Sequence, residues 1–245
     1  MKTIQRPLAR GLRPLTLLCV LLPFALGACQ TAHMRLPETL AAAQRMPVEG
    51  RQGWKLSERL RFGPFETQDV RRSWTRGRDG RILMVSGSRR DQRYSFVLRE
   101  GGQEHWRAEC QTALAVLSID AGVVEIEPTN RSALDCRMQS LREPAEHWQL
   151  VLSESRERPL SGVLRGREGT LEVKGTNRFE RGLPTQMTTG YEITEAERTL
   201  AAVEVVNSGA VWLQPDLVPM RRSMLSAAAA ALLLLEDLRE TLPES

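Results

Sequence analysis

The sequence predicts a mainly β protein, an antiparallel barrel or sandwich with a buried C-terminal helix that is apolar on all sides. Two observations lead to this fold class. From about residue 53 the chain consists of short stretches in which apolar and polar residues alternate, separated by turn-forming residues. Near its end, residues 224–235 are all apolar except Ser226. A helix without a polar stripe is buried on every side, so we expect the strands to surround it.

Eight stretches are predicted to be strands of a single domain over residues 53–245. Turn residues such as Gly101-Gly102 and Glu168-Gly169 separate them, and a further turn is expected at Arg90-Asp91. Many short strands at this spacing are typical of an antiparallel sandwich or barrel. The stretches are residues 81–88, 93–100, 105–112, 122–128, 133–140, 147–154, 160–166 and 169–176.

The last part of the domain predicts a hairpin followed by the helix. Residues 198–217 form two apolar stretches around Asn207-Ser208-Gly209, a turn sequence. Residues 218–242 follow as the helix, with Pro219 near its first turn. The twelve-residue apolar middle spans about 18 Å, which suits a small core and is too short for a bilayer. Its basic start and acidic end oppose the helix dipole, as expected if both ends protrude from an enclosing structure.

A strand-rich chain that ends in such a helix resembles the tubby-like and scramblase-like group, in which a closed barrel wraps a central C-terminal helix. The resemblance rests on this pattern over residues 53–242. It implies a closed barrel and, by analogy with that group, a lipid-binding or structural function. A β-sandwich with the helix packed across one open face is the alternative architecture.

The N-terminus predicts an export signal over residues 1–28. A basic stretch without acids precedes a short apolar run at 15–26, as in a secretory signal peptide. An N-terminal membrane anchor that is never removed is the alternative. The following Leu-Gly-Ala-Cys at 26–29 resembles the lipobox of bacterial lipoproteins. That resemblance implies cleavage after Ala28, a diacylglyceryl thioether on Cys29 and, because Gln30 is not Asp, retention at the outer membrane. Residues 29–52 are then the lipidated cysteine and a tether.

Charge excludes one class of partner. Four of the 34 Lys and Arg residues lie in the signal segment, which leaves 30 basic and 30 acidic residues in the mature chain. The basic total is therefore no argument for nucleic acid, which we do not expect as a partner. Residues 51–93 hold twelve basic against five acidic residues, whereas the following part is acidic. Either the two parts neutralise each other, or the first turns a basic face toward an anionic envelope polymer or lipid head groups.

Cysteine usage agrees with export. Cys19 is lost with the signal and Cys29 is consumed by lipid, which leaves Cys110 and Cys136. An even pair in an oxidising compartment predicts a disulfide. Neither clustered histidines nor Cys-x-x-Cys spacing is present, so we expect no metal and no thiol-redox function.

One segment is a candidate binding surface. Residues 54–76 interleave aromatic and basic residues, a composition that binds glycans or anionic polymers through stacking and cation–π contacts. The alternative places the aromatics in the core and the arginines on a strand and turn around Gly63-Pro64. The candidate residues are Trp54, Arg61, Arg71, Arg72, Trp74 and Arg76.

No catalytic set is apparent. The sequence contains no Gly-x-Ser-x-Gly, no His-Glu-x-x-His and no phosphate-binding glycine loop, and the folded part holds only two histidines, His105 and His147, with nothing that favours a triad around either. We therefore expect no cofactor and favour a non-catalytic envelope lipoprotein, held on the membrane by its anchor, that contacts envelope proteins or peptidoglycan. A barrel that binds lipid or another hydrophobic ligand, and a hydrolase with an unrecognised site, are the alternatives.

Overall fold

The computed structural model describes residues 31–51, 59–82, 85–120, 125–126, 131–155, 158–185 and 187–236. The chain divides into two units, Met1–Ala32 and His33–Ser245, and all elements below belong to the second unit. The predicted signal peptide, the predicted lipidation site Cys29 and the candidate residue Trp54 lie outside the described residues.

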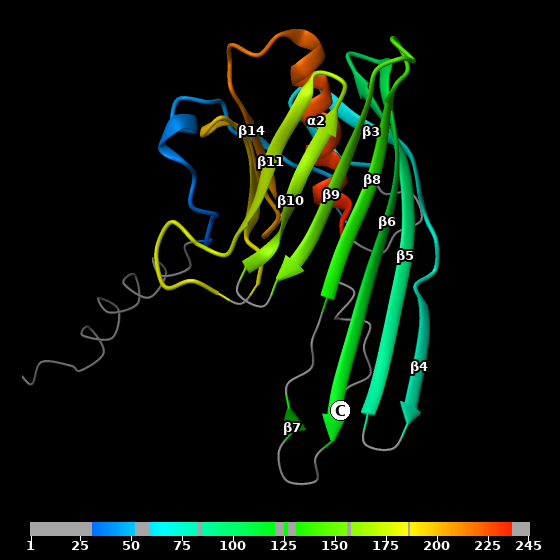
Figure 1. The fold of residues 1–245 in the computed structure, drawn as a ribbon. Helices are drawn as coiled ribbons and strands as arrows, with labels where there is room; N and C mark the ends of the chain where they lie inside the picture. Colours follow the sequence, from blue (N-terminus) through cyan, green and yellow to red (C-terminus); the bar gives the residue numbers. More distant parts are fainter. Residues whose placement is uncertain are drawn as a thin grey trace, which may run out of the picture. The chain divides into compact units, whose positions relative to one another are not determined.

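Among the described residues, fourteen antiparallel strands form one sheet, and twelve of them curl into a nearly closed barrel (Figure 1). Their order is β1-β14-β13-β12-β11-β10-β9-β8-β6-β5-β3-β2, while β4 pairs only with β5 and β7 only with β6. The predicted mainly β class is confirmed, and a barrel is formed. The strands are β1 (Met46–Pro47), β2 (Arg61–Phe62), β3 (Phe65–Arg72), β4 (Arg76–Ile82), β5 (Val85–Glu100), β6 (Gln103–Asp120), β7 (Glu125–Ile126), β8 (Arg131–Ser140), β9 (His147–Ser155), β10 (Arg158–Gly166), β11 (Gly169–Thr176), β12 (Gly190–Glu195), β13 (Arg198–Glu204) and β14 (Ala210–Leu213).

The two edges of the sheet meet at one point. Glu49 follows the edge strand β1, and Arg61 begins the other edge strand, β2. Their backbones form an antiparallel bridge in which each N–H donates to the other's carbonyl, at 2.9 and 3.0 Å. This bridge joins edge strands that lie at opposite ends of the sheet order.

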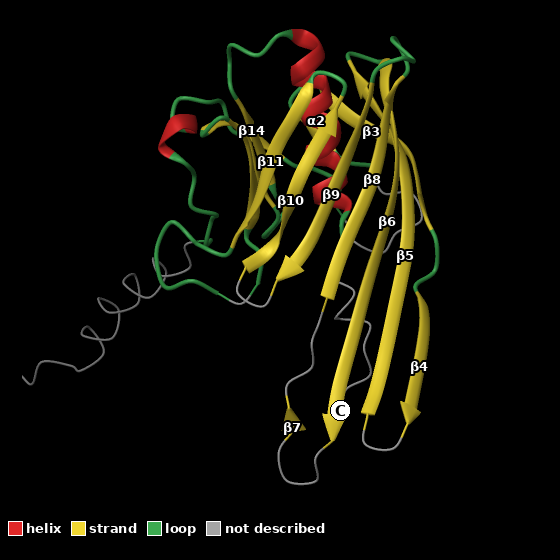
Figure 2. Ribbon diagram, in the orientation of Figure 1, coloured by secondary structure: helices red, strands yellow, loops and turns green. Residues whose placement is uncertain are grey.

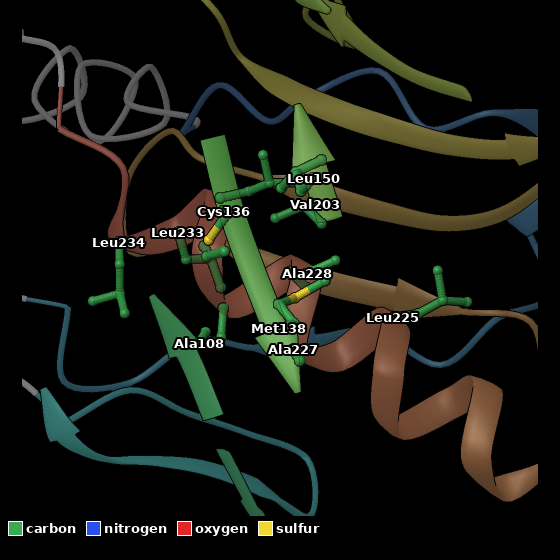
Figure 3. Close-up of a cluster of buried hydrophobic side chains, with 14 of the residues drawn as sticks. Ala108, Cys136, Met138, Leu150, Val203, Leu225, Ala227, Ala228, Leu233 and Leu234 are labelled. Carbon is green, nitrogen blue, oxygen red and sulfur yellow. The ribbon is translucent and has the colours of Figure 1, made fainter. Parts of the chain in front are cut away.

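Helix α2 (Pro219–Leu234) lies inside the barrel, and every residue from Ser223 to Leu234 is buried. Figure 3 shows helix side chains such as Ala227 and Leu233 in one cluster with side chains of the strands, including Ala108 and Leu150. The run of alanines at 227–231 keeps the helix thin, so that its backbone can approach the wall closely. The all-round apolar sequence is explained by this all-round burial.

Both helix ends have polar partners from the wall. At the C-terminal end, Arg51 Nε donates to the Leu233 carbonyl at 3.0 Å, which places a cation at the negative end of the helix dipole. At the N-terminal end the unfavourably placed Arg221 pairs with Glu195, and the guanidinium of Arg222 lies 6.0 Å from the centre of the Phe65 ring. Contacts from the barrel thus offset the charge order predicted to oppose the dipole.

The predicted disulfide is present and links two neighbouring strands. Cys110 of β6 and Cys136 of β8 are directly paired across the sheet, and both side chains are buried. The strand alternation points both side chains into the core cluster that contains the helix, where Figure 3 shows Cys136.

The barrel has two dissimilar ends. One carries tight turns, such as Gly101-Gly102, whose positive φ angles suit glycine. At the other end, strands β4, β5 and β6 continue past the barrel as a flat extension (Figure 2). The turn expected at Arg90-Asp91 is absent, because β5 runs unbroken from Val85 to Glu100. The β11–β12 connection, between Thr176 and Gly190, lies at the same end as the extension.

The first described residues pack on the outside of the barrel. Met34 and Leu40 are buried against Ala202 and Trp212 of β13 and β14. The fully buried carboxylate of Glu204 holds this segment, because Oε2 accepts from the Met34 N–H at 3.0 Å and Oε1 lies 3.1 Å from His33 Nδ1. The segment falls within the range 29–52 assigned to a tether, and from His33 onward it is packed on the wall.

Candidate functional site

A groove on the outer face of the sheet collects exposed arginines from four strands. Successive side chains of a strand point to opposite faces, so alternate residues of β3, β5, β6 and β8 face outward. One rung of the sheet runs from Arg71 through Ser95 and Glu109 to Arg137, each residue directly paired with the next. Side chains on such a rung lie close enough to act on one ligand.

The groove has two adjoining parts. The larger encloses about 510 Å³ and is lined by outward residues of β3, β5, β6 and β8, among them Arg71, Arg93 and Asp135. The smaller encloses about 360 Å³ and continues over β9, where Arg107 and His147 line it. Glu109 and Arg137 line both parts, so they form a continuous surface.

The electrostatic balance of the groove is positive. Four exposed arginines line the groove, and we call them the groove arginines. Two carboxylates, those of Glu109 and Asp135, line it as well. Within the described part of the chain, none of the four forms an ion pair within 4.0 Å of a carboxylate, while Asp135 accepts a hydrogen bond from Gln149 at 2.8 Å. Their donors therefore face solvent and can form bidentate bonds with a bound carboxylate or phosphate. The groove arginines are Arg71, Arg93, Arg107 and Arg137.

The predicted binding residues separate onto different faces. Arg71 lines the groove, and Trp74 follows close by, 89% exposed and next to the lining residue Ser73. Arg72 also borders the larger part of the groove, but its guanidinium is committed to other contacts, 3.3 Å from Glu236 and over the Tyr94 ring.

The remaining predicted residues lie apart from this groove lining. Arg61 pairs with Glu66 at 3.0 Å, and Arg76 is exposed on β4. The alternative interpretation of residues 54–76 placed their aromatic side chains in the core. It is confirmed for Phe62 and Phe65, which are buried, and it is wrong for Trp74, which is exposed.

Sequence reasoning missed Arg93, Arg107 and Arg137 as members of one surface. Each stands at an outward position within a stretch that the alternation predicted to be a strand. The outward orientation of these three side chains could therefore have been predicted from the alternation. What brings them together is the register between β5, β6 and β8, which local sequence does not encode.

No protein-family model, curated protein or solved structure matches the chain. No helix among the described residues is long and apolar enough to span a membrane. In the same described part, no group of three or more His, Cys, Asp or Glu side chains is arranged to hold a metal ion.

The two histidines occupy different environments. His105 is buried at the start of β6, with Nε2 3.8 Å from Glu100 Oε2. Burial lowers its pKa below the usual value, the nearby Arg142 lowers it further, and Glu100 opposes both effects. His147 is exposed at the groove, with Nδ1 3.1 Å from the Ala145 carbonyl.

Proposed function

We propose that this protein is a lipid-anchored envelope module without catalytic function that binds an anionic glycan polymer, peptidoglycan, through its outer groove. The anchor part of the proposal rests on the Leu-Gly-Ala-Cys sequence at 26–29, with Cys29 as the lipidated residue and Gln30 favouring the outer membrane. Lipid chains on one residue hold a domain stably at a membrane surface. The folded part then works as a module held within the envelope.

The observation that carries the binding proposal is the group of groove arginines, which form no ion pair with the described residues, beside an exposed tryptophan. Peptidoglycan offers carboxylates along a sugar backbone. Arginine suits carboxylates because its planar fork donates two parallel hydrogen bonds. Trp74, exposed next to Ser73, supplies an apolar face for a sugar ring at the edge of the same groove.

The barrel interior favours this reading over a carrier of hydrophobic ligands. In barrels that carry a ligand, the interior remains hollow. Here α2 occupies it, with its residues from Ser223 to Leu234 buried against the wall. A ligand of comparable size would need the helix to leave.

The binding proposal is tested by co-sedimentation of the lipidated full-length protein, in detergent, with purified peptidoglycan sacculi. The double variant Arg71→Glu/Arg137→Glu should bind at least roughly tenfold more weakly, because a hydrogen bond to a charged group contributes about 1.5–3 kcal/mol. Arg78→Glu/Arg89→Glu is the matched control, since these exposed, directly paired arginines of β4 and β5 lie outside the groove lining and the charge change is the same.

Two results would overturn this proposal. Sacculi that retain none of the wild-type protein would exclude peptidoglycan as the ligand. Equal loss of binding in the groove variant and the control would show a general charge effect in place of a site. The anchor is tested separately by fatty-acid labelling, which Cys29→Ser should abolish; persistent labelling would place the lipid elsewhere.

A further inference from the structure

The first described residues form a clamp with the connection between β11 and β12. The Arg35 N–H donates to the Arg178 carbonyl at 3.0 Å, and the Glu180 N–H donates to the His33 carbonyl at 2.9 Å. Met34 and Phe179 are bridged between them. Together with the bonds to buried Glu204, these contacts fix residues 33–35 to the end of the barrel that carries the extension.

The clamp limits how far the barrel can stand from the anchor. Only three residues separate Cys29 from His33 in the sequence. Four extended residue steps span at most about 14 Å. An acylated Cys29 lies at the membrane surface, so His33 and the chain clamped to it must lie within this distance of the lipid head groups.

The connection clamped there has the composition of a membrane-contacting loop. We call residues 177–185 and 187–189 the anchor-side loop. Leu183 is 86% exposed and Met187 is 65% exposed, and they are two of the four large apolar side chains that are exposed among the described residues. Arg178 and Arg181 are exposed in the same loop, and Arg35 is exposed beside it on the clamped segment.

Such a loop suits the interface of a bilayer. Apolar side chains enter the boundary between head groups and acyl chains, while arginines meet lipid phosphates. Exposure of the Leu183 and Met187 side chains to water does not stabilise the folded barrel. The loop, together with Arg35 beside it, offers two exposed apolar side chains and three cations against the one acid of the loop, Glu180, a composition complementary to an anionic lipid surface.

We propose that the anchor-side loop, with Leu183 and Met187 at its tip, lies on the bilayer next to the lipidated Cys29 and orients the barrel on the membrane. This inference rests on the lipid anchor of the proposed function. It directs the β11–β12 connection toward the membrane, on the part of the wall that lies away from the β4–β6 extension in the strand order. The tight turns, such as Arg167-Glu168, then face away from it.

A single-thiol labelling experiment tests the orientation. Lipidation occupies Cys29 and the disulfide occupies Cys110 and Cys136, so an introduced cysteine is the one free thiol of the mature chain. Lipidated full-length Leu183→Cys and Met187→Cys receive an environment-sensitive nitrobenzoxadiazole label. Glu168→Cys, at an exposed turn of the opposite end, is the matched control. The proteins are added to preformed phosphatidylethanolamine–phosphatidylglycerol vesicles that contain a phospholipid with a nitroxide on its head group.

We expect quenching at Leu183 and Met187 to be roughly threefold stronger than at Glu168, because an interfacial loop lies within the head-group layer. Vesicle flotation of each protein is measured alongside. Protein that floats but is quenched equally at both ends overturns the loop contact and leaves the anchor standing. Shielding of Leu183 from aqueous iodide without nitroxide quenching also overturns it, since a protein would then cover the loop. Protein that does not float overturns the anchor itself.

Discussion

The hydroxyl of Tyr94 donates a hydrogen bond to the carbonyl oxygen of Ala231, 2.8 Å away, inside the barrel. Ala231 belongs to the last turn of α2, where carbonyl groups lack partners within the helix. Strand β5 therefore satisfies a buried acceptor of the helix that it encloses. Burial raises the pKa of Tyr94 far above its usual value, so the phenol stays protonated and remains a donor.

Tyr94→Phe should lower the free energy of unfolding by about 1–3 kcal/mol, because the change leaves the buried Ala231 carbonyl without this donor. Urea denaturation followed by circular dichroism measures the change. An unchanged midpoint and slope would mean that the hydrogen bond adds nothing to the docking of the helix.

The disulfide should contribute substantially to stability. It closes a loop of 26 residues, and the chain-entropy estimate for such a loop is about 3–4 kcal/mol. Cys110→Ala/Cys136→Ala should therefore unfold at markedly lower denaturant than the oxidised protein. Reducing agent should lower the stability of the wild type and leave the double variant unaffected. Sensitivity of the double variant to reductant would contradict this account.

Glu204→Gln should release the clamped N-terminal segment. The side chain is fully buried, and its two oxygens meet the Met34 N–H and the His33 ring, so an amide would turn a donor toward one of them. Hydrogen exchange in residues 33–45 should become faster, with a local cost of about 1–3 kcal/mol. Glu38→Gln, an exposed change in the same segment, is the control. Equal exchange in both variants would assign no clamping role to Glu204.

Stability should fall as pH decreases below the normal histidine range, in part through His105. Burial, with Arg142, lowers the pKa of this histidine in the folded state, so the unfolded chain binds the proton more readily. The contribution is fully present above the unfolded pKa near 6.5 and is lost as pH falls toward the folded value. His105→Gln should flatten the stability profile between neutral and mildly acidic pH. His147→Gln, an exposed change, is the control for the substitution itself.

Local sequence patterns predicted most of the elements. Alternation identified the strands from β8 to β11, and Asn207 and Gly209, both with positive φ, make the expected turn between β13 and β14. The all-round apolar run predicted a buried helix, which ends at Leu234 in the structure, and residues 237–242 of the predicted helix lie outside the described residues. These features depend on residues that are close together in the sequence, so local sequence patterns were enough to predict them.

The features that were missed depend on distant residues. Arg90 was assigned to a turn, yet it lies buried in β5 because Asp79 of β4 accepts its hydrogen bonds at 2.7 and 3.2 Å. Met34 and Leu40 resembled part of a tether because their partner Trp212 stands far along the chain. The groove likewise depends on register across four strands, whereas Arg71 alone was found from local composition.

The placement of α2 sets the order in which the molecule can assemble. Strand β1, at Met46–Pro47, pairs with β14, at Ala210–Leu213, and the helix that fills the barrel follows still later in the chain. A polypeptide is synthesised from its N-terminus, so the strands of the wall are made before the helix that fills them. Contacts of such long sequence separation form slowly. The apolar lining of the barrel must therefore stay without its final contacts, and away from other chains, until the helix at Pro219–Leu234 is available.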